Sequence, residues 1–482
     1  MKTQEIEPSG NLQTFIASVK ENPNAIQPVY PPDPGPLFTG LLQADNRNRE
    51  EISRINPTLC THDPQLYKHE ETGMYYTCSS GAGGTLRRSR DLVHWEYVGP
   101  GMRQYAPPAA VEWAHYNDSL KPRGFSAPEV HRTGEKEYRM YYAVSTWGHR
   151  QSYIGMARSE GPEGPFIDAG PIVTNTEASP VNALDANWIR DPETGAEYMN
   201  FGSFWGGIRQ IQLDPATGLR LMNGQPYHGR EIWKRHHNVD RAVEGAYEIW
   251  NPDTGYFYMF TSYDCTNLDY NIRVARSRSI SGPFYDHNGV EVNNTATGTD
   301  PDAIGLKIVD CHQFEDHFGW AATGHNGILR EGDHWLISYH SHPTANLKAS
   351  AQRIHLMIFD EEGWPLVFPC QYTGEKLQKL DPALIPGIYE RILFDKPDGK
   401  RLCRQSRRMY LRADGAVWID GQPGNWKFIR DYELELTAGG LTDHTYVVPA
   451  FDTDRGVPTL ALTGRRSDGI CTWGKKRSDA AK

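Results

Sequence analysis

The sequence lacks the features that mark membrane proteins and nucleic-acid-binding proteins. No apolar run approaches the roughly 20 residues that a membrane-spanning helix needs, which excludes a helical membrane protein. Asp and Glu number 60 against 50 Lys and Arg, a net charge of −10, and no basic cluster offers a surface for nucleic acid. We therefore expect neither a membrane nor a polyanion as a partner.

Cysteine is scarce and shows no pattern. The seven cysteines are an odd number, lie far apart, and include no pair at the spacing of a zinc or redox motif, so we interpret them as ordinary thiols. The first residues, MKTQEIEPSGNLQTF, lack the apolar stretch of about 7–15 residues that a secretory signal requires. This favours a cytoplasmic location, and a secreted protein is the alternative if a leader has been removed.

What the sequence does contain is an internal repeat. An aromatic-rich segment ending in serine recurs five times, and before each copy lies a turn sequence such as DPETG or NPDTG, typical of the joins between antiparallel strands. Repeat units of roughly 60 residues made of short strands, without helical periodicity between them, are typical of propeller blades. The five closing serines are Ser80, Ser145, Ser203, Ser262 and Ser341.

The repeat predicts an all-β fold, a five-bladed β-propeller followed by a small C-terminal β-barrel or β-sandwich domain. We place the propeller at residues 55–384 and the C-terminal domain at 385–482, where alternating segments such as RMYLRAD and YELELTA predict half-buried strands. Residues 1–54 contain VYPPDPGPLF, whose prolines predict an extended segment that packs on the propeller.

One polar residue lies at nearly the same distance before each closing serine, on the predicted first strand of its blade. The first strand of a blade is innermost, so these side chains should converge on the axis of the propeller. Carboxylates around a funnel suit glycosidic bond cleavage, which needs one acid and one base or nucleophile, and a third carboxylate can raise the pKa of the acid. The five residues are Asp63, Glu129, Asp185, Glu244 and His325.

At these residues the chain resembles glycoside hydrolase family 43, specifically its arabinanase branch. The C-terminal domain likewise resembles the β-barrel module appended to some arabinanases, through GNWKFI (424–429) and ICTWGKK (470–476). Seven motifs that span the proposed propeller in the family's order carry the resemblance: THDPQLYK (61–68), FSAPEV (125–130), VNALDANWI (181–189), VEGAYEI (243–249), SYDCTNLDYNIRVARS (262–277), GHNGIL (324–329) and DEEGWPLV (360–367).

The resemblance implies cleavage of α-1,5-L-arabinofuranosidic bonds in arabinan or arabino-oligosaccharides with inversion of configuration. It implies Asp63 as general base, Glu244 as general acid, and Asp185 as the residue that raises the pKa of Glu244 and orients it. Inversion leaves about 6.5–9.5 Å between the base and the acid, which is room for water. It also implies a calcium ion, held largely through water on the axis near His325. Calcium prefers oxygen ligands, so by residue chemistry alone a hydrogen-bonded histidine or a transition-metal ligand stays open.

Seven further residues are candidates for binding substrate. Phe125 stands where the family has Trp in a Trp-Ala-Pro motif, so the ring can form a sugar platform without the indole N–H. Aromatic faces stack on sugar rings, although plain core packing is the alternative for Trp147, Trp205 and Tyr270. The polar candidates are Glu129, Asn187 and Ser203.

Several alternatives remain. Arg190-Asp191-Pro192 reproduces a triplet of sucrose- and fructan-acting propellers, but the chain lacks their Asn-Asp-Pro-Asn-like nucleophile motif. An α-L-arabinofuranosidase or β-xylosidase would use the same three carboxylates, although the DCTNLDYN segment argues against both. A non-enzymatic propeller would have lost the acid or the base.

Two insertions and several histidines have weaker interpretations. Residues 110–124 and 300–320 lengthen blade connections, and our hypothesis is that they wall off part of the groove. We expect exo action if they close one end of the groove and endo action if they leave it open. The remaining histidines are expected to be solvated or hydrogen-bonded, because none pairs at the spacing of a zinc motif: His236, His237, His312, His317, His340 and His342.

Overall fold

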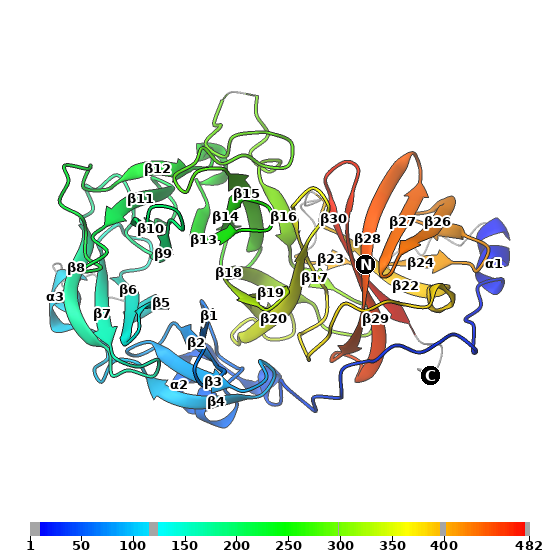
Figure 1. Cartoon of the computed structure of the whole chain (residues 1–482), viewed down its shortest axis with the longest axis horizontal. Coiled ribbons are helices and arrows are strands. Elements are labelled where there is room, and N and C mark those ends of the chain that lie inside the picture. Colours follow the sequence, from blue (N-terminus) through cyan, green and yellow to red (C-terminus); the bar gives the residue numbers. More distant parts are fainter. Residues whose placement is uncertain (1–9, 115–123, 297, 396–401, 478–482) are drawn as a thin grey trace.

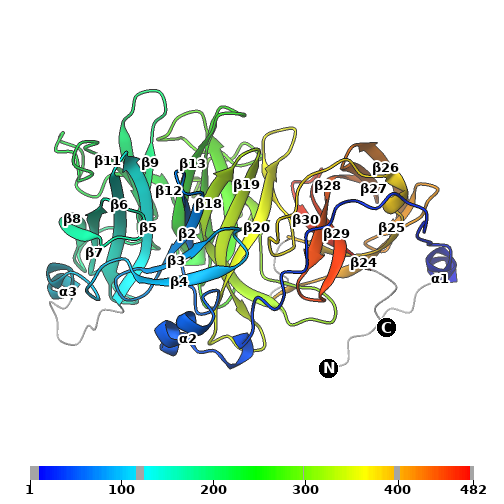
Figure 2. The ribbon, with the colours of Figure 1, turned by 60° about the horizontal axis from the view of Figure 1, so that its bottom comes forward.

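Five β-sheets are arranged radially around one axis, and a closed β-barrel lies beside them, next to the fifth sheet (Figure 1). A view turned by 60° shows the same placement of the two domains (Figure 2). The structure is a computed structural model that describes residues 10–114, 124–296, 298–395 and 402–477 of the 482-residue chain. The five-bladed propeller and the C-terminal barrel predicted from the sequence are confirmed.

Each of the first four blades is a four-stranded antiparallel meander whose first strand lies nearest the axis (Figure 1). Blade 1 contains β1 (Gln65–His69), β2 (Met74–Ser79), β3 (Thr85–Ser89) and β4 (Trp95–Pro100), and blade 2 contains β5 (Gly124–Gly134), β6 (Glu137–Ser145), β7 (Ser152–Ser159) and β8 (Ile167–Asn175). Blade 3 contains β9 (Asn187–Arg190), β10 (Glu197–Phe201), β11 (Ile208–Leu213) and β12 (Arg230–Trp233), and blade 4 contains β13 (Val243–Asn251), β14 (Tyr256–Tyr263), β15 (Asn271–Ser277) and β16 (Leu306–Val309).

The fifth blade closes the ring and has six strands in the order β21-β20-β19-β18-β17-β23. The segment before blade 1 lies against its strand β20, where Leu59 bridges Ala351 and the Cys60 N–H donates to the Ser350 carbonyl at 2.7 Å. Residues from the two ends of the propeller thus join it into a ring. The strands of this sheet are β17 (His312–Gln313), β18 (Trp320–Glu331), β19 (His334–Pro343), β20 (Ala351–Phe359), β21 (Pro365–Val367) and β23 (Arg404–Gln405).

Local sequence explains both the hairpins and the burial of their strands. In the DPETG turn Asp191 Oδ1 accepts the Glu193 N–H at 2.9 Å, and Gly195 takes a φ of 73° that favours glycine. Strand β14, YFYMFTSY, is buried at every residue but its first, because blades pack on both faces of each sheet. Its aromatic run is therefore core sequence.

The C-terminal domain is a closed barrel whose last strand, β30, pairs with its first, β22. Trp473 of β30 is buried, and its ring lies edge-on to His312 of blade 5 at 4.9 Å, which joins the barrel to the propeller. The strands are β22 (Gly387–Leu393), β24 (Arg407–Leu411), β25 (Ala416–Ile419), β26 (Gln422–Arg430), β27 (Glu433–Ala438), β28 (Leu441–Asp452), β29 (Val457–Arg466) and β30 (Cys471–Arg477).

The N-terminal segment differs from the extended arm expected over residues 1–54. It contains helices, and its first part packs on the barrel, where Phe15 contacts Trp418 with ring centroids 5.9 Å apart. The prolines at residues 28–36 lie in the extended part of the segment, between the helix at 10–17 and the 3-10 turn at 41–43. The helices and 3-10 turns of the chain are α1 (Gly10–Ala17), η1 (Leu41–Gln43), η2 (Asn46–Asn48), α2 (Arg49–Ile55), α3 (Pro108–Ala114), η3 (His237–Val239) and η4 (Pro382–Leu384).

Among the described residues, no helix has the length and apolar character needed to cross a membrane. Of the insertion at 110–124, residues 115–123 lie outside the described residues. In the insertion at 300–320, Glu315 pairs with Arg408 at 2.9 Å and with Arg477 at 2.8 Å, so this part contacts the barrel. The hypothesis that both insertions limit the groove stays a prediction.

Candidate active site

In every blade, one residue with positive φ lies within the innermost strand or just before it, next to the axis of the propeller. In β5, β13 and β18 the ladder shifts register at this point, as at a β-bulge, and such irregularities re-aim side chains. The positive φ is costly for residues other than glycine, by about 1–3 kcal/mol. The five residues are Asp63 (56°), Ala127 (43°), Asp185 (58°), Gly245 (59°) and His325 (53°).

The carboxylate of Asp63 is surrounded by hydrogen-bond donors. Asp63 Oδ1 lies 2.7 Å from His62 Nδ1 and 3.2 Å from His325 Nδ1. Asp63 Oδ2 accepts the hydroxyl of Ser80, whose oxygen in turn accepts the Ala127 N–H at 2.8 Å. The side chain is 7% exposed, and both oxygens are held in fixed directions.

Asp185 and Glu244 are neighbours at the axis, and both act electrostatically on His325. Asp185 Oδ2 accepts the N–H of Gly245 at 3.1 Å, and so holds the backbone directly after Glu244. Glu244 is partly exposed, and its oxygens accept Ser203 Oγ at 2.5 Å and Tyr270 OH at 2.9 Å. The carboxylates from blades 1, 3 and 4 therefore face one axial space.

Glycine is required between these groups. A Cβ at Gly245 would lie 3.2 Å from His325 Nδ1, and the positive φ of Gly245 adds strain for any other residue. His325 itself is held because its N–H donates to Ser262 Oγ at 2.8 Å. The absence of a side chain at Gly245 thus leaves room for the imidazole of His325.

The buried carboxylates have opposite pKa shifts. Burial alone would raise the pKa of Asp63, but the imidazoles of His62, His325 and His340 hold it well below its ordinary value. Burial raises the pKa of Asp185 to about 7, and repulsion from Glu244 and Asp63 adds to it, against the attraction of His325. Asp63 is therefore ionised near neutral pH, whereas Asp185 keeps its proton to a higher pH than an ordinary aspartate.

Blade 2 does not supply the axial carboxylate that the count from Ser145 predicts. The bulge in β5 puts Ala127 at the level of Asp63, and Glu129 instead bonds His131 Nε2 at 2.8 Å and Asn187 Nδ2 at 3.2 Å. Asn187 is fully buried, and its Oδ1 accepts the Glu248 N–H. Both residues belong to a buried polar network, and contact of either with substrate stays a prediction.

The aromatic candidates divide between core and surface. Phe125 is 4% exposed and stacks on Tyr142 with centroids 4.7 Å apart, so its face cannot serve as a sugar platform. Tyr270 is also buried and acts through its hydroxyl on Glu244. Trp147 is 52% exposed and Trp205 is half-buried, which leaves these two rings accessible.

Sequence reasoning missed the residues that hold the carboxylates. Ser80 and Ser262 were used only to count positions, yet they contact Asp63 and His325, and Ser203, predicted to bind substrate, contacts Glu244. The recurrence of a hydroxyl at the end of an otherwise aromatic strand was the available signal. His62 and His340 gave no such signal, because blades 1 and 5 meet only when the ring is closed.

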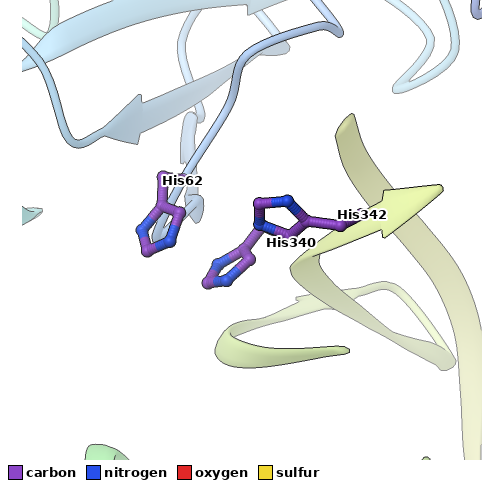
Figure 3. Close-up of side chains that lie close together, drawn as sticks. All are labelled: His62, His340 and His342. Carbon is purple, nitrogen blue, oxygen red and sulfur yellow. The ribbon is translucent and has the colours of Figure 1, made fainter. Parts of the chain in front are cut away.

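Of the other histidines, His340, His312 and His342 are buried rather than solvated. His312 Nδ1 lies 2.9 Å from the Asp310 carbonyl, and His342 Nδ1 lies 2.9 Å from the Leu347 carbonyl. Among the described residues, His62, His340 and His342 are the one set of three metal-binding side chains whose ligand atoms gather within 4.8 Å (Figure 3). His325 belongs to no such set, so a calcium ion beside it would depend on water oxygens.

The axial site holds one carboxylate that can accept a proton and one carboxyl group that can donate a proton. An ionised carboxylate with fixed oxygens can accept a proton from water, and Glu244, bonded by two hydroxyls, can give one up. Hydroxyls both donate and accept, so the bonds from Ser203 and Tyr270 suit a carboxyl group in either protonation state. This chemistry is hydrolysis of a bond with a poor leaving group.

Comparison with known proteins agrees with this chemistry. Residues 56–365 match the model described as Glycosyl hydrolases family 43, and residues 369–474 match a C-terminal lipocalin-like domain. The chain is 30% identical to a protein of Thermotoga petrophila named extracellular endo-α-(1→5)-L-arabinanase, over 91% of this chain and 96% of that one.

Solved structures show the same likeness. A crystal structure of the endo-1,5-α-L-arabinanase from Thermotoga petrophila superposes with a TM-score of 0.75 and 28% identity, covering 87% of this chain and 98% of that one. An exo-1,5-α-L-arabinanase from a bovine ruminal metagenomic library gives a TM-score of 0.54 and 28% identity over 64% of this chain and 96% of that one. Likeness extends to both endo- and exo-acting proteins.

Proposed function

Because the chain belongs to family 43 of the glycosyl hydrolases, we propose that it hydrolyses α-1,5-L-arabinofuranosidic bonds of arabinan or arabino-oligosaccharides at the propeller axis. The observation that carries the proposal is the meeting of Asp63, Asp185 and Glu244 from three blades around His325. The names of the Thermotoga and ruminal relatives support arabinan as the substrate class.

In the proposed reaction Asp63 is the general base and Glu244 the general acid. Asp63, kept ionised by imidazoles, takes the proton from the water that attacks the anomeric carbon, and Glu244 protonates the leaving oxygen. Asp185 orients the acid, because it accepts the N–H of Gly245 next to Glu244. Attack by water opposite the leaving group gives inversion of configuration.

An α-L-arabinofuranosidase or a β-xylosidase of the same family is the second candidate function. Both enzymes would use Asp63, Asp185 and Glu244, and the geometry at the axis is the same for an α-L-arabinofuranosidase as for a β-xylosidase. The accessible Trp147 and Trp205 favour a substrate longer than one sugar, since exposed rings stack on successive sugar faces.

A calcium ion held mainly through water beside His325 is part of the proposal. His325 Nδ1 is used by Asp63, so Nε2 is the nitrogen left for an ion, and the three carboxylates give the space a negative potential that suits a cation. Such an ion would supply positive charge near the reacting sugar. We expect about one equivalent of calcium by atomic emission in the wild type and its loss in His325→Ala, and a calcium-free wild type would contradict this.

The site of action is proposed from the relatives rather than from the N-terminus. The Thermotoga protein is named as extracellular, so the comparison supports the secreted alternative and gives no support to the cytoplasmic expectation. Arabinan is a polymer that an extracellular enzyme meets directly. Fractionation of the cells that produce the protein, followed by immunoblotting, decides between the two locations.

The proposed function is tested by following products over time on linear arabinan, debranched arabinan and xylan, with Glu244→Ala as the blank. We expect arabino-oligosaccharides from arabinan and nothing from xylan, and proton NMR of the first products should show the inverted anomer. A spread of early oligomers indicates endo action, and one short product indicates exo action. Activity only on xylan or on monomeric aryl glycosides would contradict the arabinanase proposal.

A further inference from the structure

The imidazoles of His62, His340 and His342 lie close together (Figure 3). Asp63 Oδ1, on the proposed base, lies 2.7 Å from His62 Nδ1 and 3.7 Å from His340 Nδ1. His62 precedes β1, while His340 and His342 lie on β19 of blade 5, so the group spans the seam where the ring closes. Three imidazoles, of which two are buried and His62 is partly exposed, can hold zinc, and the Nε2 of His342 is buried without a hydrogen-bond partner. The hydrogen positions on the other two rings decide what this group does.

The partners of His62 and His340 fix which nitrogen carries hydrogen. His62 Nδ1 lies 2.7 Å from Asp63 Oδ1, and an ionised carboxylate only accepts, so Nδ1 carries a hydrogen, and in the neutral ring Nε2 has a lone pair. His340 Nδ1 accepts the backbone N–H of Asp63 at 3.2 Å, so in the neutral ring Nε2 carries the hydrogen. At Nε2, His340 therefore offers a hydrogen-bond donor and His62 offers an acceptor.

Thr266 lies at both Nε2 edges. Its Oγ1 is 3.4 Å from His340 Nε2 and 3.4 Å from His62 Nε2, and the residue is 7% exposed. A hydroxyl accepts and donates at once, so it can accept from His340 and donate to His62. The chain of bonds then runs from the Asp63 N–H through His340, Thr266 and His62 back to Asp63 Oδ1, with every donor matched to an acceptor.

The same geometry disfavours a metal. A metal would need three converging lone pairs, but His340 Nε2 carries hydrogen while Nδ1 accepts from Asp63. The His62 and His340 rings are stacked, with centroids 3.8 Å apart and planes 22° apart, so their in-plane nitrogens point side by side. His342 packs edge-on to both rings and bonds the Leu347 carbonyl.

We propose that Thr266 is a positioning residue that closes a ring of four hydrogen bonds on Asp63 and so aims the base. The ring holds the backbone N–H of Asp63, which stabilises its positive φ, and one carboxylate oxygen. The two Thr266 contacts are long, so the ring acts by orientation more than by strength. This inference rests on the role of Asp63 proposed above.

The position of Thr266 in the loop between β14 and β15 adds a consequence. The same loop ends at Tyr270, whose hydroxyl donates to Glu244, and it is tied to blade 5 by the Ala322 N–H to the Leu268 carbonyl at 3.0 Å. One short segment therefore contacts the supports of the base and of the acid. A change in this loop would move both groups together.

Thr266→Val removes the hydroxyl at nearly constant volume and is the test variant. Misaiming a base lowers turnover rather than binding, so we expect kcat on linear arabinan to fall about tenfold with KM within about twofold. Thr266→Ser restores the hydroxyl and should recover most of the turnover. The matched control is Thr261→Val, a buried threonine of β14 whose Oγ1 has no hydrogen-bond partner, which should leave kcat unchanged.

Nitrogen NMR of protein labelled with 15N-histidine reports which ring nitrogens of His62 and His340 carry hydrogen. These chemical shifts would not change if Thr266 had only a packing role. We expect a hydrogen on Nδ1 of His62 and on Nε2 of His340, with the nitrogen signals of both rings shifted in Thr266→Val and not in Thr261→Val. Wild-type turnover in Thr266→Val would overturn the ring. So would stoichiometric zinc binding to chelator-treated enzyme that is lost in His342→Gln.

Asp63→Asn separates this inference from the proposed function. If Asp63→Asn loses turnover while Thr266→Val keeps it, the ring fails and the proposed function stands. If Asp63→Asn keeps turnover, the role of Asp63 fails, and the ring then positions nothing catalytic.

Discussion

The barrel and the propeller axis treat buried charge in opposite ways. In the barrel Lys475 lies 2.9 Å from both Asp452 and Asp454, and although burial opposes its charge, the two carboxylates raise the pKa of Lys475 above its ordinary value. At the axis Asp185 accepts a backbone N–H and Glu244 accepts two hydroxyls, and no Lys or Arg of the described residues pairs with either carboxylate. Paired charge stabilises a structure, whereas charge held by neutral donors remains free to exchange protons and to meet a ligand.

The largest effect should come from Glu244→Gln, which removes the acid and keeps the shape. General acid catalysis contributes about 10²–10⁴-fold, so kcat on linear arabinan should fall by about that factor. An aryl α-L-arabinofuranoside with an acidic leaving group needs little protonation, so its turnover should fall far less. Steady-state kinetics on both substrates measure this, and equal losses on the two would contradict an acid role for Glu244.

Lys475→Met should produce the largest loss of stability. It removes the cation nearest to both buried carboxylates, leaving Asp452 with Arg455 at 3.0 Å and Asp454 with His317 at 3.7 Å, and breaking a buried pair costs about 3–5 kcal/mol. The midpoint of urea unfolding should fall, while kcat of the folded enzyme stays unchanged. Lys427→Met, which breaks an exposed pair with Glu435 on the same barrel, is the control and should cost under about 1 kcal/mol. Similar losses in the two variants would erase the contrast between paired and unpaired charge.

Glu375→Gln should change how stability depends on pH. Glu375 is buried, and burial raises its pKa to about 7 from an ordinary value of 4.5. The folded state therefore binds this proton more tightly, so its contribution to stability is greatest below about pH 4.5 and falls as pH rises to about 7, by roughly 3 kcal/mol. Urea unfolding at pH 5 and pH 8 should show a smaller decline in Glu375→Gln than in the wild type. An unchanged decline would place the cause elsewhere, and Glu193→Gln on an exposed turn is the control.

Trp147→Ala should have the smallest effect. Its half-exposed ring is a candidate sugar platform, and one stacking contact changes binding modestly, so KM should rise about threefold on arabinan with kcat unchanged. Ile429→Ala replaces an exposed apolar side chain of the barrel and should leave KM unchanged. A fall in kcat without a change in KM would place Trp147 outside the binding surface.

The sequence predicted the blades because their signal is local. The turn at Asp191 and the aromatic strand β14 fold as their own residues dictate, and counting from the closing serines placed Asp63, Asp185 and Glu244 near the axis. The same count failed in blade 2, because a bulge puts Ala127 where Glu129 was expected.

Contacts across the seam were beyond sequence reasoning. His62 and His340 come from opposite ends of the propeller, and Thr266 reaches them from a third place in the chain. No spacing within one strand encodes such a meeting. The burial of Phe125 against Tyr142 likewise depends on how the strands of blade 2 pack. The sequence alone therefore predicted a sugar platform where the structure has a core residue.

The bridge between Leu59 and Ala351 sets an order for folding. Each hairpin can form as its own residues leave the ribosome, but the ring closes only after blade 5 exists, because contacts between distant residues form late. Until then the acidic groups of blades 1, 3 and 4 stay dispersed in water and do not repel one another. We therefore expect the axial site to assemble only after blade 5 has folded, so chains that end before blade 5 should lack hydrolytic activity.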